Sequence, residues 1–316
     1  MSTSIAAPGT LAYGIQLPIQ TLTQTLREPW EVDASVADLV AVAKAADDAG
    51  CAFVGVCDHI ALPQNDYTKH MTTTWYDPVA TLGFLAAHTT NVRLLSVVYI
   101  AAYRHPLQSA KSFLTIDHLS GGRAILGVGA GHVEGEFEAL GIDFATRGAR
   151  TNEAIDAIRA AFESEYSSFE GEFFRYGEVG LAPRPAAGTI PIWIGGSGKP
   201  ALRRVAERGD GWIPQGTPRA QMRESVDYIR RHRDEVRPGA HIDLGFMPEW
   251  LYVGEPSWDT GGYTITGSPE RLAESLREAH DFGCTVLHLH FRSRDRQELC
   301  DQLAAFGRDV APLLAR

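Results

Sequence analysis

An aspartate and a histidine stand side by side directly after a short apolar run. The run AFVGVC covers residues 52–57, and Asp58 and His59 follow it. Carboxylate and imidazole groups can transfer protons near neutral pH, and both can also ligate a metal ion. The same two residues could instead cap a turn and face solvent. This pair is therefore a candidate acid–base site that needs support from the rest of the chain.

Three glycines occupy alternate positions in GVGAGHVEGEF, residues 127–137. The dinucleotide-binding pattern GxGxxG is not met, because His132 stands where its last glycine would be. Glycine has no Cβ and so permits close approach of the backbone to another group. We interpret the glycines as an approach to a flat or anionic ligand, with packing at a strand end as the alternative. The glutamates after His132 are predicted to form the solvated start of a helix.

A second glycine-rich stretch lies between a predicted strand and a predicted helix. It comprises Gly195, Gly196, Ser197 and Gly198, and a helix is expected to start near Lys199. Free N–H groups at a helix start attract anions. The P-loop pattern GxxxxGK[ST] is absent. The stretch thus favours a phosphate-binding turn over a purely structural one.

Two further histidines, His288 and His290, lie in LHLHF. Residues two apart in a strand face the same side, so the pair resembles the HxH of metal-dependent barrel hydrolases. Those hydrolases carry HxH on their first strand, whereas this one falls near the end of the chain. A matching set of carboxylates and a bridging lysine are also missing. We therefore expect no metal ion.

Composition narrows the class of protein. The chain of 316 residues has a formal net charge of −10, which argues against nucleic acid and anionic membranes as partners. Its four cysteines form no CxxC pair, residues 1–10 do not resemble a signal peptide, and no apolar run is long enough to span a membrane. These features predict a cytoplasmic globular protein that acts on a small molecule.

Strand-like and helix-like segments alternate along almost the whole sequence, and the strands are continuous apolar runs. This alternation predicts a parallel sheet covered by helices, namely a single (β/α)8 TIM barrel over residues 1–316. Active sites of such barrels lie at the C-terminal ends of the strands. Strands are expected at 11–18, 52–57, 92–100, 124–129, 190–195, 211–214, 242–254 (strand or hairpin) and 285–291, and helices at 33–50, 77–90, 107–119, 134–140, 148–164, 199–208, 219–236, 268–282 and 295–314.

Three connections are too long to be simple turns. They cover residues 58–76, 165–189 and 254–267, and we expect them to form insertion segments of the barrel. Long ordered loops in a compact domain commonly form lids or walls of sites. The middle one is rich in Phe, Gly and Pro, and a small hairpin is predicted within it.

Several motifs in the same order resemble the luciferase-like monooxygenase superfamily, and more narrowly its branch of coenzyme F420-dependent oxidoreductases. The resemblance runs from about residue 11 to residue 214. It is carried by the DH pair and by YRHPLQSAKSFLTIDHLSGGR, LGVGAGHVEGEFEALGIDFATRGARTNEAIDAIRAAF and PIWIGGSGKPALRRVAERGDGW.

This resemblance implies a TIM barrel that binds a deazaflavin at its C-terminal face. In relatives a non-prolyl cis peptide supports the ring, and its position corresponds here to Val97–Val98. Asp58 and His59 would lie beside the ring and the substrate, and the backbone at Ala130 and Gly131 would meet the cofactor. The tail of the cofactor would bind at Gly195, Gly196, Ser197 and Gly198.

The resemblance also implies hydride transfer between the deazaflavin C5 and a small organic substrate, with reduction of an activated double bond favoured over oxygen activation. His59 and His132 are the candidate proton donors or acceptors, because imidazole titrates near neutral pH. Relatives carry Trp or Glu at the position of His132, and we do not expect sugar-phosphate oxidation without that Glu. Pocket-wall candidates are Trp75, Tyr76 and Tyr103.

Two alternatives remain open at this point. One is an FMN-dependent monooxygenase of the same superfamily, supplied by a separate reductase. The other is a non-catalytic flavin-binding protein on the same barrel. Relatives further suggest a homodimer.

Overall fold

The chain forms a closed barrel of parallel strands in the computed structural model, which describes residues 4–7 and 9–315. Each strand pairs with the next around the ring, and the last pairs with the first. The predicted TIM barrel is thereby confirmed. In ring order the strands are β1 (Ala12–Gln16), β2 (Phe53–Val56), β3 (Arg93–Ser96), β5 (Ala124–Gly129), β8 (Ile192–Gly195), β9 (Gly211–Ile213), β10 (Asp243–Phe246) and β13 (Val286–Leu289).

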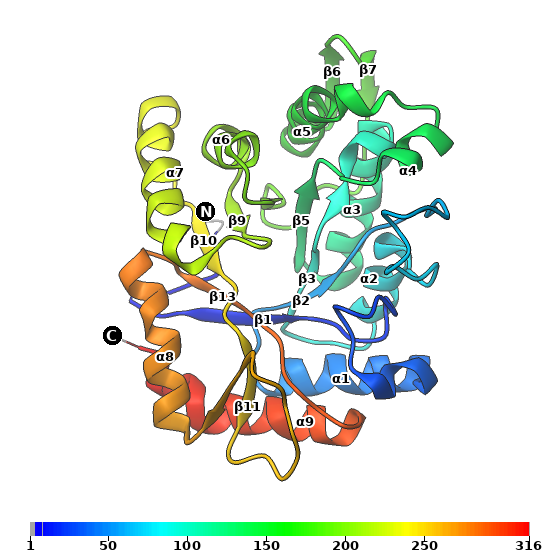
Figure 1. Ribbon diagram of the computed structural model, residues 1–316. Helices are drawn as coiled ribbons and strands as arrows, with labels where there is room; N and C mark the ends of the chain where they lie inside the picture. The colour runs from blue at the N-terminus through cyan, green and yellow to red at the C-terminus, as the bar shows by residue number, and fades with distance from the viewer. Residues whose placement is uncertain (1–3, 8, 316) are drawn as a thin grey trace.

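Helices surround this ring of strands (Figure 1). Most begin at the expected kind of residue: Ser35, for example, caps α1 by accepting a hydrogen bond from the Asp38 N–H. The helices are α1 (Val36–Asp48), α2 (Pro78–Ala86), α3 (Pro106–Ser120), α4 (Glu134–Ala139), α5 (Arg147–Glu163), α6 (Lys199–Arg208), α7 (Met222–Val236), α8 (Pro269–Phe282) and α9 (Arg296–Ala305).

In the described part of the chain, every helix is too short or too polar to cross a membrane. Residues 1–3 and 8 lie outside the described residues, so the expectation about a signal peptide in 1–10 stays a prediction.

The strands are buried on both faces, which explains their continuous apolar sequence. One face packs against the surrounding helices, and the other fills the barrel interior. A compact apolar cluster occupies the interior below the C-terminal ends of the strands. Its buried members are Phe53, Leu95, Val97, Ile125, Trp193, Ile213 and Val286.

Two predicted strands are interrupted. The segment 92–100 divides into β3 and β4 (Tyr99–Ile100), with a cis peptide bond between Val97 and Val98. The segment 242–254 divides into β10 and β11 (Trp250–Val253) around Pro248, which has no N–H to donate to a ladder.

The interpretation of 242–254 as one strand or a hairpin was wrong. β11 pairs in parallel with β12 (Thr264–Gly267), which lies inside the segment predicted as a loop. The predicted hairpin within 165–189 is confirmed: β6 (Tyr166–Glu170) and β7 (Arg175–Gly180) pair antiparallel beyond the end of α5 (Figure 1).

Glycines at the ends of β5 and β8 make room for the neighbouring β3–β4 segment. A Cβ on Gly127 would lie 2.0 Å from the backbone oxygen of Ser96. A Cβ on Gly129 or on Gly195 would lie 2.3 Å or 2.4 Å, respectively, from a methyl group of Val98. At these three positions glycine is therefore needed for close packing at the strand ends, which was the alternative interpretation.

We predict that Gly127→Ala destabilises the fold by about 2–3 kcal/mol, because the barrel has no space for the added methyl group. The matched control is Gly83→Ala in α2, where nothing lies within 4 Å of the added Cβ. Ala is the better helix former there, so the control should not destabilise. Urea unfolding measures both free energies, and equal values for the two variants would contradict this account of the glycines.

Candidate active site

A cavity of about 440 Å³ opens at the C-terminal ends of the barrel strands. This is the face at which enzymes of this architecture carry out their chemistry. Its lining comes from segments that follow most of the strands. The lining residues are Gln16, Thr23, Thr25, Leu26, Cys57, Asp58, His59, Met71, Trp75, Val97, Val98, Ile100, His132, Gln215, Gly216, Met247, His288 and His290.

His59 forms a hydrogen bond with a glutamate from another element. Its Nδ1 lies 2.8 Å from Oε2 of Glu136, on α4. The Tyr103 hydroxyl donates to the same carboxylate oxygen at 2.9 Å, and the backbone N–H groups of Ile60 and Ala61 donate to Oε1. The His59 ring is thus held by a carboxylate that is itself fully hydrogen-bonded.

Glu136 has no solvent exposure, yet it is arranged to stay ionised. Burial alone raises the pKa of a carboxyl group, but the hydrogen bond and charge of His59, together with the Ile60 and Ala61 N–H groups, outweigh it and lower the pKa of Glu136. Burial, followed by the nearby Glu136, raises the pKa of the Tyr103 hydroxyl, so this hydroxyl keeps its proton.

Glu136 was missed by the sequence analysis, which placed the glutamates after His132 at the solvated start of a helix. That expectation was wrong for Glu136. A signal was present: Val133, Glu136, Phe137 and Leu140 have the i, i+3, i+4, i+7 spacing of one helix face, and Val133 and Phe137 are buried. Glu134 and Glu138, on the other side of α4, are exposed as predicted.

Aromatic rings enclose His59 on its remaining sides. The Trp75 ring centroid lies 4.4 Å and the His132 ring centroid 5.6 Å from that of His59. His132 reaches solvent at the cavity mouth beside Tyr67, 6.1 Å away. The surrounding protein atoms, and then the charge of His59, lower the pKa of His132, while Glu136 acts in the opposite direction. The two candidate proton carriers thus lie together.

Asp58 points toward β4. Its carboxylate is 3% exposed and pairs with both terminal nitrogens of Arg104, at 2.5 and 2.9 Å. It also accepts the Ile100 N–H at 2.8 Å. Asp58 borders the cavity, but its oxygen atoms are engaged in fixing the segment that follows Val97 and Val98.

Val97 and Val98 line the cavity between β2, β5 and β8. Their peptide bond is cis, at the position to which the resemblance assigns such a bond. The Val97 side chain packs against Gly55, and that of Val98 lies between Gly129 and Gly195. The two valines form an apolar wall that cannot shift toward the neighbouring strands.

Several predicted residues lie behind the cavity wall. Among the described residues, the lining includes Trp75 but neither Tyr76 nor Tyr103. Ala130 and Gly131 directly precede His132 without lining the cavity themselves, and Gly131 has φ +79°. Gly195, Gly196, Ser197 and Gly198 also lie outside the lining.

The glycine-rich turn nevertheless touches the rim of the cavity. The Ser197 hydroxyl donates to the Gln215 carbonyl at 2.7 Å, and Gln215 lines the cavity. Gly198 is the N-cap of α6, with a proline in the first turn of the helix, as the sequence predicts. The first N–H groups of a helix lack intrahelical acceptors and can bind an anion.

His288 and His290 line the opposite side of the cavity, with ring centroids 5.1 Å apart. They face the same way, as the spacing predicts. Within the described residues, no group of three or more metal-ligating side chains comes together. The expectation of a site without metal is compatible with this arrangement and stays a prediction.

The sequence matches the luciferase-like monooxygenase family over residues 13–251. The chain belongs to this family. It is 31% identical over 223 residues to the Mycobacterium tuberculosis protein Rv0953c, which covers 68% of this chain and 75% of that protein.

A second relative from the same organism has a named activity. The F420-dependent hydroxymycolic acid dehydrogenase of Mycobacterium tuberculosis is 34% identical over 180 residues, 56% of this chain and 48% of that protein. The matched region is therefore about half the length of this relative.

Solved structures share the barrel at low sequence identity. Monooxygenase RslO1 from Streptomyces bottropensis superposes with a TM-score of 0.78 at 21% identity, over 96% of this chain and 100% of that one. An F420-dependent secondary alcohol dehydrogenase, solved with an F420–acetone adduct, gives a TM-score of 0.76 at 16% identity, over 97% and 100%. At these identities the likeness concerns the fold.

We predict that Glu136→Gln lowers the free energy of unfolding by about 2 kcal/mol at pH 7, because a buried acceptor of four hydrogen bonds is weakened. The folded-state pKa of Glu136 is lowered, so the carboxylate stabilises the fold above the ordinary glutamate pKa. This contribution disappears as the pH falls through the lowered value, and the two proteins should converge in acid.

The matched control is Glu138→Gln, an exposed position on the same helix. It should leave the stability at pH 7 within about 0.5 kcal/mol of the wild-type value. Chemical unfolding from pH 7 down to pH 3 tests both variants. A difference between wild type and Glu136→Gln that stays constant with pH would show that the charge of Glu136 is not the cause.

Proposed function

We propose that this protein is an F420-dependent oxidoreductase that transfers a hydride between the deazaflavin C5 and a small organic substrate. Family membership supports an oxidoreductase. The relative with a named F420-dependent activity supports the choice of cofactor. The observation that carries the proposal is the His59–Glu136 pair, placed on the cavity at the C-terminal face of the barrel, beside the apolar wall of Val97 and Val98.

The residues of the cavity fit a flat cofactor. Its volume of about 440 Å³ lies in the range of small-molecule sites. Val97 and Val98 offer an apolar surface for a ring, and the Val98 side chain is held between Gly129 and Gly195. The α6 start at Gly198 and Lys199 would hold an anionic tail. When bound, the deazaflavin supplies a two-electron hydride carrier.

The residues of this chain supply the acid–base part of the reaction. The Glu136 carboxylate orients the His59 ring through Nδ1 and leaves Nε2 as the atom that can deliver or take up a proton at the cavity. His132 is kept uncharged near neutral pH by its lowered pKa, so it can accept a proton from a neighbouring group. Trp75 packs against the imidazole and limits the access of water to it.

A cofactor-binding experiment tests the proposal. Equilibrium titration with reduced F420 and with reduced FMN should give micromolar binding of F420 and at least about tenfold weaker binding of FMN, equivalent to about 1.4 kcal/mol. FMN binding without F420 binding would instead support a monooxygenase supplied by a separate reductase. Binding of neither would overturn both assignments.

We further predict that His59→Asn slows single-turnover hydride transfer by about 10²-fold or more, because the proton carrier is lost. Cofactor affinity should change by less than about threefold, because the Val97–Val98 wall remains and Asp58 still fixes the segment that follows it. His118→Asn, an exposed position on α3, is the control and should match the wild type. Stopped-flow absorbance of the deazaflavin reports the rate.

Full activity of His59→Asn would refute the role of His59. Lack of any reaction of the wild type with a broad substrate panel would favour a non-catalytic flavin-binding protein.

A further inference from the structure

One strand of the barrel carries a row of inward-facing side chains that changes from apolar to polar. On β13, Val286 belongs to the apolar interior cluster and His288 follows it on the same face, while His290 comes directly after the strand; both histidines line the cavity. The ring order places β13 four strands from β5 in both directions, through β1, β2 and β3 or through β10, β9 and β8. These two histidines therefore face the cavity from the side opposite the β5 end.

His288 has hydrogen-bonding capacity that the protein does not use. Its side chain is 2% exposed, and neither ring nitrogen has a partner among the described residues. Its ring lies near two other rings, those of Phe53 at 5.8 Å and His290 at 5.1 Å. Buried polar atoms without partners are costly and rare, so this position calls for a polar group that enters the cavity.

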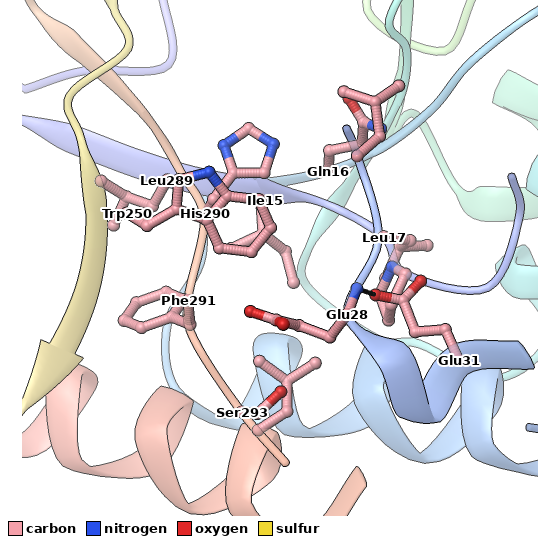
Figure 2. A pocket seen from close by; sticks show the side chains of 13 residues that line it. Ile15, Gln16, Leu17, Glu28, Glu31, Trp250, Leu289, His290, Phe291 and Ser293 are labelled. Atoms are coloured by element: carbon pink, nitrogen blue, oxygen red, sulfur yellow. Dashed lines mark hydrogen bonds between the residues drawn. The ribbon is translucent and has the colours of Figure 1, made fainter. Parts of the chain in front are cut away.

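Packing against a neighbouring ring holds the His290 side chain, and its ring nitrogens remain available to a ligand. It lies 5.3 Å from the Trp250 ring, and Arg292 sits over that indole at 4.1 Å while pairing with Glu28 at 3.1 Å. Figure 2 shows His290 among the residues that line a smaller neighbouring pocket, together with Glu28 and Glu31. Among the described residues, no hydrogen bond is made by its imidazole, so His290 can also serve a ligand in the main cavity.

The cavity is unsuited to an anion. Its described lining contains no lysine or arginine, and its only carboxylate, Asp58, is already paired with Arg104. Burial lowers the pKa of His288 well below its ordinary value and lowers that of His290 to about 4, with Arg292 adding to the second shift. A carboxylate or phosphate at these rings would lose its hydration and gain no cation in return.

We propose that His288 and His290 form the substrate-recognition side of the cavity and bind an uncharged carbonyl group, as in a ketone, aldehyde, ester or amide. A neutral imidazole offers one N–H donor and one acceptor, and the two rings can donate to one carbonyl oxygen from two sides. This inference rests on the proposed function, which places the cofactor at the Val97–Val98 wall and so leaves the β13 side to the substrate.

The test is a pair of titrations on the cofactor-loaded protein at pH 7, with cyclohex-2-enone as the uncharged probe and cyclohexanecarboxylate as the anionic one. His288→Phe keeps a ring but removes both nitrogens, and His290→Phe is the second variant because it is less buried. We expect the ketone to bind wild type and to bind each variant about tenfold more weakly, the loss of one hydrogen bond. The carboxylate should bind wild type at least about tenfold more weakly than the ketone.

The affinity of each variant for the cofactor tells whether His288 and His290 bind a carbonyl group of the substrate or one of the cofactor. It should stay within about twofold of wild type in both variants, and His118→Asn should match wild type throughout. Loss of cofactor affinity with unchanged ketone affinity would assign the two histidines to the cofactor. Equal binding of ketone and carboxylate, unchanged ketone binding in both variants, or no ketone binding by wild type would each overturn the inference.

If neither F420 nor FMN binds, the proposed function fails by itself. The ketone titration is then made on the protein without cofactor, and the same variants still decide whether His288 and His290 bind a carbonyl group. Thermal melting of each variant confirms that it is folded before either titration is interpreted.

Discussion

The buried carboxylate of Glu136 is the interaction on which the arrangement of the active site depends. It accepts hydrogen bonds from the His59 ring, from Tyr103 and from the first N–H groups of the segment after β2. A charge with no solvent exposure persists only where such donors compensate for the lost hydration. The donors come from two separate stretches of the chain and the acceptor from a third, so this one carboxylate fixes the positions of the segment after β2, α4 and the segment after β4 relative to one another.

Asp58 and His59 complete this arrangement because adjacent residues at a strand end point in different directions. Asp58 pairs with Arg104 and with the Ile100 N–H, while His59 pairs with Glu136 on α4. One dipeptide thereby connects β2 to both of the elements that enclose Val97 and Val98. The apolar wall and the proton-carrying imidazole are consequently positioned by the same two carboxylates, Asp58 and Glu136.

Features set by local sequence were the predictable ones. The barrel follows from apolar runs that alternate with helical periodicity, and the start of α6 follows from Gly198 and the proline after Lys199. The resemblance located the cis peptide at Val97–Val98, which no local pattern indicates. β12 could not be found because its pairing with β11 is a long-range contact. Glu136 escaped because glutamates at the start of a short helix are ordinarily solvated, and its partners Tyr103 and His59 lie 33 and 77 residues away.

The cavity also shows how environment gives the same side chain two different capacities. The His59 ring is hydrogen-bonded to the buried carboxylate of Glu136. His288 lies between aromatic rings, with no carboxylate in contact, and burial there keeps the imidazole neutral. The β2–β5 side of the cavity thus presents an imidazole hydrogen-bonded to a carboxylate, whereas the β13 side presents imidazoles that burial keeps neutral. A substrate that spans the cavity would meet two chemically different surfaces, one at each end.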